Sequence, residues 1–314
     1  MKIGALIITT GLSRVSGVSA LLSQVGSITA GQRMISAFQC VEASLIGLVV
    51  GPEEKKSERQ LSQNGVIFLR CPEDTGFFRG LQEGLSFMCG KFDRVFVVPG
   101  DVPLFLPSTL QAMLQSTAPM VVPEAKHVNG YPLLLDGQAI DFLLAQPDFS
   151  TAEEAVRQGK LPLESIRVED SGILLRSGDM NQRKLLIQNH NHQLSRPVTE
   201  VTLNNGSPLY DPRLSMLLHL VEDTRSVRDA CSLMQISYSS AWNMLNHVED
   251  SLGFPLVQRI RGGSTGSGSV LTEQGKQIMD AYDRFTDDLN KISKELYIKF
   301  FEAVANSNTG QNYF

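Results

Sequence analysis

Cysteine is scarce in this sequence, with four residues among 314, and no two of them have the spacing of a zinc or redox motif. Isolated cysteines of this kind are mostly small buried hydrophobic residues. We favour that interpretation over metal ligands or a disulfide framework. The positions are Cys40, Cys71, Cys89 and Cys231.

Long apolar runs and an excess of positive charge are also missing. No apolar run approaches the roughly 20 residues that a membrane-spanning helix needs. The short run Ile3–Ile8 has no small-residue cleavage site behind it, so it predicts a strand and not a signal peptide. The net charge of -5 argues against a broad basic surface for nucleic acid, although a local basic patch stays open. We therefore expect a soluble, cytoplasmic protein that contacts no membrane.

The sequence is long enough for two domains, and its hydrophobic content of 42% allows each an ordinary core. From residue 1 to about residue 190, short apolar runs alternate with helical patterns. This alternation predicts an α/β domain with a Rossmann-like, mostly parallel sheet covered by helices on both faces. The expected strands are Ile3–Ile8, Leu45–Val50, Val66–Leu69, Arg94–Val98, Met120–Val122 and Tyr131–Leu135. The expected helices are Phe78–Cys89, Pro107–Gln115, Gln138–Leu144 and one opened by the capping pair Ser150 and Glu153.

A polar, turn-rich stretch follows the first domain. It runs from Gln188 to Ser207, and we place a linker at residues 191–208. His190 and His192 lie near its start. Two histidines in so polar a stretch favour a solvated turn over a metal site.

The sequence after the linker has the pattern of a winged helix-turn-helix domain. The second of its three short helices begins after Ser226, a preferred helix cap. His219 falls on the apolar face of the first helix, and we expect it to pack there. The expected parts are a winged helix-turn-helix at 209–272 with helices at Pro212–Val221, from Ser226 and at Ser237–Leu252, a long helix at 273–305 and a disordered tail at 306–314.

The start of the third short helix carries small polar side chains that suit contact with DNA. The N-terminus of such a helix faces base edges and phosphates, and an asparagine there can pair with adenine at two atoms. Arginines on a flexible hairpin supply charge along a phosphate backbone. The expected DNA-contacting residues are Ser237, Tyr238, Ser239, Ser240, Asn243, Arg259 and Arg261. On these residues alone, a winged helix that binds another protein remains an alternative.

The run Ser226–Tyr282 resembles the DNA-binding domain of the ModE regulators, which respond to molybdate, and more distantly that of the LysR-type regulators. The segments ISYSSAW, LGFPLVQR, GGSTGSGS and VLTEQGK fall in register with the ModE pattern, and the glycine-rich wing before LTxxG is characteristic of that branch. The resemblance implies a DNA-binding transcription regulator that dimerises through its last helix. We therefore expect a homodimer.

Residues 1–190 resemble the MobA-like nucleotidyltransferases, which join a nucleotide to molybdopterin or a related substrate. This resemblance implies the nucleotide-diphospho-sugar type of nucleotidyltransferase fold. The family begins with a strand and the loop LAAGxSxRMGxxK, and Gly11, Ser13 and Gly17 match it here. The lysine position holds Ala20.

The rest of this loop and a second glycine segment complete the expected nucleotide site. The arginine position of the loop holds Val15, one residue after Arg14. CPEDTGFFRGLQEGL resembles the family segment that lies near the base and the acceptor, with Gly80 at the position of a serine. Because glycine amides can cradle phosphates, the expected nucleotide-binding residues are Gly11, Ser13, Arg14, Gly17 and Gly76.

The segment VVPGDVPLF resembles the family's GDMPF, whose aspartate binds magnesium, and that position is Asp101 here. An aspartate at the end of an apolar strand suits a Mg²⁺ ion shared with nucleotide phosphates, so the expected cofactor is Mg²⁺ with CTP or GTP. Without the resemblance, a turn aspartate that holds no ligand is an equal alternative. NGYPLLL resembles the family's GHPxLF, which predicts a substrate pocket at Gly130, Tyr131 and Pro132.

The family segment DPGILLDIDT corresponds to EDSGILLRSGD, in which Arg176 and Gly178 stand at the two aspartate positions and Asp179 comes next. Together with Val15 and Ala20, these changes remove charges that stabilise a transferring phosphoryl group. Losing one well-placed donor typically costs ~3–4 kcal/mol, so we expect no fast catalysis and assign no catalytic residue.

Three hypotheses follow from the sequence. The first is a transcription regulator linked to the molybdenum cofactor, whose nucleotidyltransferase-like domain senses a nucleotide or molybdopterin. The second is an active, Mg²⁺-dependent nucleotidyltransferase that joins CTP or GTP to molybdopterin and carries a regulatory DNA-binding domain. The third is a protein-interaction scaffold, which becomes attractive only if neither DNA nor nucleotide binds.

Overall fold

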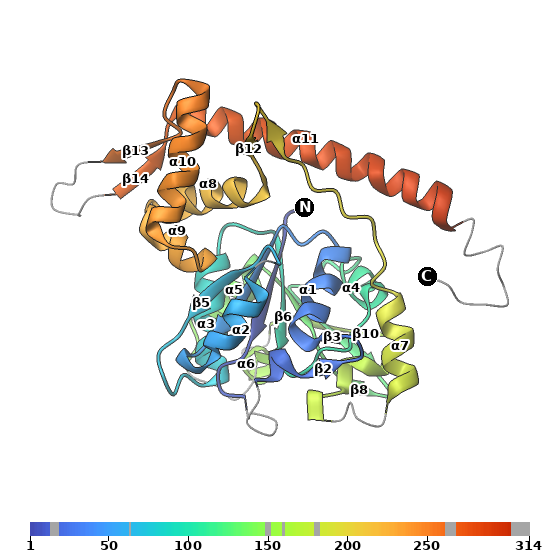
Figure 1. Ribbon diagram of the computed structural model, residues 1–314. Helices are drawn as coiled ribbons and strands as arrows, with labels where there is room; N and C mark the ends of the chain where they lie inside the picture. The colour runs from blue at the N-terminus through green and yellow to red at the C-terminus, as the bar shows by residue number, and fades with distance from the viewer. Residues whose placement is uncertain are drawn as a thin grey trace. The chain divides into compact units, whose positions relative to one another are not determined.

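The computed structural model describes residues 1–12, 19–62, 64–147, 152–158, 161–178, 183–260 and 268–302 (Figure 1). The chain divides into two compact units, Met1–Leu194 and Ser195–Phe314, and each is described by itself. Several predictions fall outside the described residues. They concern Ser13, Arg14, Gly17, Ser150, Arg261 and the tail at 306–314.

The N-terminal unit is built on an eight-stranded sheet. Its path runs β10-β7-β9-β6-β1-β4-β5, and β8 pairs with β7. Neighbours are parallel except for β9, which runs antiparallel to β6 and β7, and β8, which runs antiparallel to β7. The mostly parallel α/β fold is therefore confirmed. The strands are β1 (Ile3–Ile8), β4 (Leu45–Val50), β5 (Ile67–Arg70), β6 (Arg94–Pro99), β7 (Met120–Ala125), β8 (Val128–Asn129), β9 (Leu133–Asp136) and β10 (Leu163–Arg167), with a separate hairpin of β2 (Gln24–Val25) and β3 (Ile28–Thr29).

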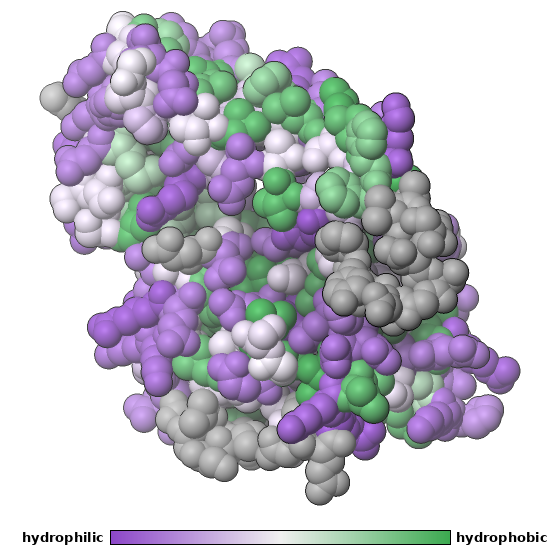
Figure 2. Space-filling view, turned by 45° about the vertical axis from the view of Figure 1, so that its right-hand side comes forward, coloured by the Kyte–Doolittle hydropathy of each residue, from purple (hydrophilic) through white to green (hydrophobic). Residues whose placement is uncertain are grey.

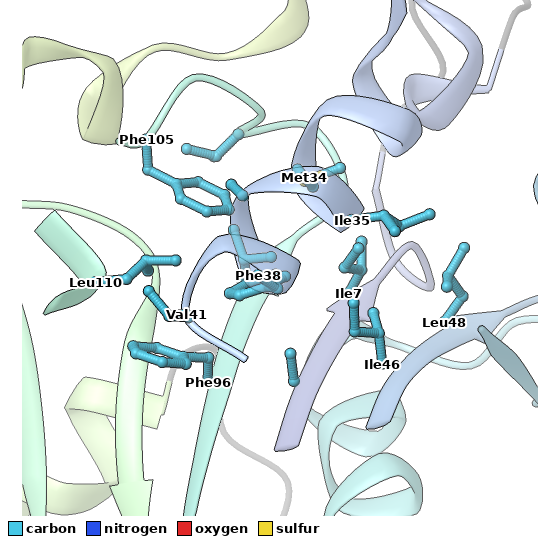
Figure 3. Packing of buried hydrophobic residues seen from close by; sticks show 14 of the residues in the cluster. Ile7, Met34, Ile35, Phe38, Val41, Ile46, Leu48, Phe96, Phe105 and Leu110 are labelled. Carbon is cyan, nitrogen blue, oxygen red and sulfur yellow. The ribbon is translucent and has the colours of Figure 1, made fainter. Parts of the chain in front are cut away.

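Helices cover both faces of this sheet and enclose a hydrophobic core on each face. Successive side chains of a strand point to opposite faces, so Ile7 of β1 joins one core and Ile8 the other. Phe38 and Leu110 belong to the first core, which Figure 3 shows. The helices are α1 (Ala30–Cys40), α2 (Lys55–Leu61), α3 (Phe77–Met88), α4 (Pro107–Met113), α5 (Gly137–Leu144), α6 (Ala152–Gln158) and α7 (Lys184–His192), with short 3₁₀ turns η1 (Ala20–Leu22), η2 (Pro52–Glu54) and η3 (Ser171–Leu174).

Helix α7 corrects the sequence analysis, because residues 188–192 are helical and not part of a polar linker. Ile187 and His190, three residues apart on one helix face, are both buried. Most residues of this helix are polar, so the buried face carried little hydrophobic pattern. His192 is exposed, whereas His190 is a core residue and does not lie in a solvated turn.

The C-terminal unit has the three short helices, the hairpin and the long helix that the sequence predicts. The predicted cap is present, because the Ser226 side chain accepts a hydrogen bond from Asp229 N. Helix α10 ends at Gly253, which has the left-handed conformation. A small hairpin, β11–β12, also lies partly within the predicted linker. The elements are β11 (Leu203–Asn204), β12 (Pro208–Tyr210), α8 (Pro212–Thr224), α9 (Val227–Met234), α10 (Tyr238–Leu252), β13 (Val257–Ile260), β14 (Gly268–Leu271), α11 (Glu273–Tyr297) and the π-helical turn η5 (Ile298–Glu302). Among the described helices, none combines the length and apolar character that crossing a membrane requires.

Candidate ligand site and DNA-binding surface

The candidate ligand site lies where two central strands end. Strands β1 and β6 are parallel neighbours, with Ile8 paired to Pro99. From β1 the chain continues to β4 and β5 on one side, and it then returns to β6 on the other side. In sheets of this kind ligands bind at such a switch point, outside the carboxyl ends of the strands. Gly11 follows β1 and Asp101 follows β6, so the structure brings these two predicted residues to one edge.

Gly11 also brings the loop close to the start of α3. Its φ is +69°, and a Cβ placed on it would lie 2.4 Å from the backbone N of Phe77. Gly76 is the N-cap residue of α3 and makes no side-chain cap, because it has no side chain to donate or accept. Predicted residues Gly11 and Gly76 therefore lie together, beside the backbone N–H groups that open a helix of twelve residues. Such a helix start favours an anion.

Thr10 explains why glycine replaces the family serine at position 80. Thr10 Oγ1 lies 3.5 Å from the carbonyl oxygen of Gly76, to which it can donate. A Cβ on Gly80 would lie 1.9 Å from that same Oγ1. The threonine hydroxyl thus occupies the space that a residue larger than glycine at position 80 needs. Thr10 stands at the second alanine of the family's LAAG, so the departures from the family pattern at positions 10 and 80 are coupled.

We therefore predict that Gly80→Ser alone destabilises the N-terminal unit by about 1–3 kcal/mol, because it overpacks the contact with Thr10. Adding Thr10→Ala is expected to recover most of that loss, since the two side chains compete for one space. Urea unfolding of the two single variants and the double variant measures this coupling. Simply additive losses would contradict it.

Asp101 is in contact with an arginine. Its side chain is 14% exposed, and its Oδ2 lies 2.5 Å from Nη1 of Arg176, whose side chain is 55% exposed. The other oxygen, Oδ1, is buried and has no hydrogen-bond partner among the described residues. Ser177 N donates to the Asp101 carbonyl at 2.7 Å. The backbone next to Arg176 is thus fixed to the end of β6.

This arrangement does not fit a divalent metal ion held by two carboxylates. Magnesium prefers oxygen ligands in a near-octahedral arrangement, and a guanidinium offers donors and no lone pair. Arg176 stands at one of the family's aspartate positions, and Asp179 lies outside the described residues. Within the described part of the chain, no group of three or more histidines, cysteines, aspartates or glutamates is placed to hold a metal. The binding of Mg²⁺ by Asp101 stays a prediction.

The predicted substrate segment Gly130–Pro132 packs against the turn that carries Arg176. Tyr131 N donates to the Ile173 carbonyl at 3.1 Å, and a Cβ on Gly130 would lie 2.7 Å from the same oxygen. Tyr131 is partly buried and packs against both hydrophobic cores, and Pro132 is buried. This contact gives the glycine a structural role, and the substrate pocket stays a prediction.

A buried polar network behind the site was missed by the sequence analysis. Arg33 of α1 is 0% exposed, and its Nη1 donates to the carbonyls of Pro103 at 2.5 Å and Phe105 at 2.9 Å. Its Nε donates to Asn191 Oδ1 of α7 at 3.0 Å. Burial lowers the pKa of Arg33 to about 10, and the nearby charge of Asp170 acts in the opposite direction.

Asp170 is the acceptor at the centre of this network. Its Oδ2 accepts from Leu106 N at 2.8 Å and Thr109 Oγ1 at 2.7 Å. Its Oδ1 accepts from Gly172 N at 2.9 Å and lies 3.1 Å from His190 Nε2. The network holds the chain that follows Asp101. The only sequence signal for this network was that the family segment DPGILLDIDT also has an aspartate at position 170.

In the C-terminal unit, the predicted DNA-contacting residues gather at the exposed start of α10. Ser237 Oγ caps the helix by accepting from Ser240 N at 3.0 Å, and it lies 3.1 Å from Ser239 Oγ. Tyr238 and Asn243 are exposed as well. The structure thus brings together the five predicted residues of this helix.

An aromatic contact joins the hairpin to α10. The Arg259 guanidinium of β13 lies over the Trp242 ring, 5.0 Å from its centroid. The rings of Tyr238 and Trp242 are 6.1 Å apart, edge to face. Arg228 of α9 lies 6.0 Å from the Tyr238 centroid and was not predicted as a site residue. These contacts place two arginines beside the start of α10, where they add positive charge.

The last helix presents apolar side chains to solvent. Phe285, Ile292 and Leu296 are each about half exposed. Figure 2 shows hydrophobic residues, drawn in green, on the surface of one face of the molecule. His219 does not pack in an apolar core as predicted. Its half-exposed ring lies on the side of α8 that faces α11, where His219 Nε2 is 2.7 Å from Asp283 Oδ2.

The sequence pattern of the MobA-like NTP transferase domain matches residues 5–161, half of the chain. The chain belongs to this family. The pattern of the bacterial regulatory helix-turn-helix proteins of the lysR family matches residues 213–276. A MobA-like unit and a helix-turn-helix unit are therefore joined in one protein.

Curated relatives match a smaller share of this chain. The transcriptional regulator ModE of Yersinia pestis is 37% identical over 73 residues, which is 23% of this chain and 28% of that protein. The DNA-binding transcriptional dual regulator ModE of Escherichia coli K12 is 36% identical over the same shares. The molybdenum transport protein ModE of Azotobacter vinelandii is 26% identical over 35% of this chain and 45% of its own. The chain spans less than half the length of these relatives.

Solved structures resemble the MobA-like unit. Rv0371c from Mycobacterium tuberculosis superposes with a TM-score of 0.51 at 16% identity, covering 59% of this chain and 97% of that one. A nucleotidyl transferase from Methanothermobacter gives 0.50 at 18% identity, covering 62% and 98%. At these identities the likeness establishes the nucleotidyltransferase fold and nothing more.

Proposed function

We propose that the protein is a DNA-binding transcription regulator linked to the molybdenum cofactor, in which the MobA-like unit is a sensor for a nucleotide or a molybdopterin-type ligand. The observation that carries this proposal is the exposed start of α10, with Arg259 of the hairpin held over Trp242 beside it. The molybdenum transport protein ModE among the relatives and the MobA-like family both point to molybdenum metabolism, which supports the link.

The ligand-sensing role is supported by what the MobA-like unit keeps and what it has changed. Gly11 still turns the loop toward the start of α3, which suits a phosphate. Ala20 is buried in η1 at the position of the family lysine, and Arg176 contacts Asp101. The unit therefore keeps the loop geometry that suits a phosphate, but it differs from the family at charged positions that support nucleotide transfer. A ligand then alters DNA binding only by its difference in affinity for two states of the protein.

The apolar residues of α11 support a homodimer formed through this helix. A helix face with half-exposed phenylalanine, isoleucine and leucine gains stability when a second copy covers it. In this proposal residues 209–272 bind DNA and residues 273–305 dimerise. A two-fold symmetric pair would present two copies of α10 to two half-sites.

The first test removes the positive charge of the wing. We expect Arg259→Ala with Arg261→Ala to weaken binding to a random-sequence duplex and to lower the slope of log affinity against log salt by about 1.8, because each lost phosphate contact contributes about 0.9. Fluorescence anisotropy over a salt series measures both. Lys56→Ala with Arg59→Ala, which removes two exposed positive charges from α2 of the MobA-like unit, is the matched control. An unchanged slope would remove the wing from the proposal.

A second candidate is an active nucleotidyltransferase that joins CTP or GTP to molybdopterin. The position of Asp101 at the switch point favours it. Pyrophosphate release is measured with Mg²⁺, a nucleotide and molybdopterin, beside Asp101→Ala and a variant with Val15→Arg and Ala20→Lys. Turnover by the wild type that Asp101→Ala abolishes would establish the enzyme. Nucleotide binding without turnover supports the sensor.

A further inference from the structure

We propose that the Arg176 guanidinium takes the place of a divalent metal ion, so that the MobA-like unit binds a nucleoside triphosphate without needing a metal. Arg176 would contact the phosphates directly, and Asp101 would position it. The proposal rests on the sensor role stated above and specifies its chemistry: a metal-independent site for the triphosphate group.

The first observation is the ion pair itself. Arg176 Nη1 lies 2.5 Å from Asp101 Oδ2, the carboxylate expected to hold the metal. A cation therefore already neutralises this carboxylate. The family pattern has an aspartate at position 176, so one substitution removes a carboxylate, a group that can bind a metal ion, and supplies a positive charge at the same point.

The second observation is that the arginine is held in position and still reaches solvent. Ser177 N and Ser177 Oγ both approach the Asp101 carbonyl, at 2.7 and 3.3 Å. Gly172 packs so tightly on the chain before α4 that a Cβ there would lie 2.0 Å from the Leu104 carbonyl. The turn that precedes Arg176 is thus fixed, while the side chain stays 55% exposed to a ligand.

The third observation is the location. Arg176 meets Asp101 at the carboxyl end of β6, next to β1 and the loop of Gly11. A planar guanidinium suits phosphate recognition because two of its N–H groups can bind two oxygens of one phosphate. A guanidinium brings one positive charge and hydrogen-bond donors, whereas Mg²⁺ brings two positive charges and coordinates the oxygens of a departing pyrophosphate directly. Such a site holds a nucleotide and does little to help its cleavage.

The experiment compares nucleotide binding with and without metal, using the full-length protein, isothermal titration calorimetry and CTP and GTP as probes. For the wild type we expect the same Kd in excess EDTA and in excess MgCl₂. Arg176→Asp is expected to lose about 10- to 100-fold in affinity in EDTA, the usual effect of removing a charged hydrogen bond. MgCl₂ should restore its binding, because the variant has two facing carboxylates.

Three further variants sharpen this comparison. Arg176→Gln is expected to lose affinity in EDTA without recovery in MgCl₂, because it supplies neither a cation nor a carboxylate. Asp101→Asn in the Arg176→Asp background should abolish the recovery. The control is Arg59→Asp, which changes an exposed arginine in the last turn of α2. This arginine lies where the chain leads back toward the amino end of β5, so the variant should bind the nucleotide as the wild type does.

Two outcomes would overturn the proposal. One is wild-type binding that disappears in EDTA, which would mean that a metal is required after all. The other is that neither nucleotide binds in either condition. Binding of the same samples to a DNA duplex is measured in parallel, since DNA binding that persists in either case leaves the regulator proposal standing and removes only this inference.

Discussion

Replacing Asp170 by alanine is expected to lower the free energy of unfolding of the MobA-like unit by about 3–5 kcal/mol, the usual effect of removing one partner of a buried charged group. Asp170 is 2% exposed. The variant would leave Arg33 without its nearby counter-charge, His190 without its partner, and Leu106 N and Thr109 Oγ1 without their acceptor.

The single tryptophan allows this loss to be assigned to one unit. Trp242 lies in the C-terminal unit, so its fluorescence follows that unit, while far-UV circular dichroism follows both. In urea, Asp170→Ala should shift the dichroism transition and leave the fluorescence transition in place. Asp141→Ala, at an exposed aspartate of α5, should change stability by less than about 0.5 kcal/mol. An Asp170→Ala variant as stable as this control would show that the network contributes nothing.

The free energy of unfolding of Asp170→Asn should fall between those of Asp170→Ala and Asp141→Ala. An amide keeps one oxygen for Leu106 N and Thr109 Oγ1 and loses the negative charge that faces Arg33 and His190. The difference between the two variants therefore measures the hydrogen bonds to Leu106 N and Thr109 Oγ1, because Asp170→Asn loses both the charge and the acceptor for Gly172 N.

The elements that could be predicted are those whose sequence signal lies within a few neighbouring residues. Strands β1 and β4 are continuous apolar runs, as expected for strands buried on both faces. Helices α9 and α10 have a serine before the first turn, and α10 has a glycine after the last. Each of these signals depends only on local backbone chemistry, so a single sequence contains it.

The parts that were not predictable depend on partners far away in the chain. Asn191 and Arg33 are 158 residues apart and make one hydrogen bond. A polar helix such as α7 offers no hydrophobic period from which its buried face can be inferred. In the same way, glycine at position 80 looked like a lost serine until Thr10 was seen beside it.

The loss of an aspartate at position 176 was visible in the sequence, but its consequence was not. An arginine side chain at position 176 could adopt many rotamers. The backbone after η3 is held to Asp101 by the Ser177 N–H group, and this places the Arg176 guanidinium in contact with the Asp101 carboxylate. The sequence therefore predicted Mg²⁺ at Asp101 and slow catalysis, whereas the structure shows an arginine in contact with the same carboxylate.

Replacing Gly275 by alanine is expected to destabilise the helix-turn-helix unit by about 3 kcal/mol, the upper part of the range for overpacked contacts. A Cβ at this position would lie 2.3 Å from the Leu256 carbonyl oxygen. That oxygen cannot move aside easily, because Thr272 N donates to it at 2.9 Å and Thr272 Oγ1 donates to the neighbouring Pro255 carbonyl at 2.6 Å. The strain therefore has to separate α11 from the start of β13.

This prediction connects the long helix to DNA binding, since β13 carries Arg259. The Trp242 fluorescence transition in urea should shift to lower concentration while the MobA-like unit keeps its own stability. Gln274→Ala, at the exposed neighbouring position, is the matched control and should leave the transition unchanged. Affinity for a DNA duplex, measured well below the transition, should fall for Gly275→Ala if the base of the hairpin positions Arg259. Full affinity in a destabilised variant would show that Trp242 alone is sufficient to hold that arginine beside α10.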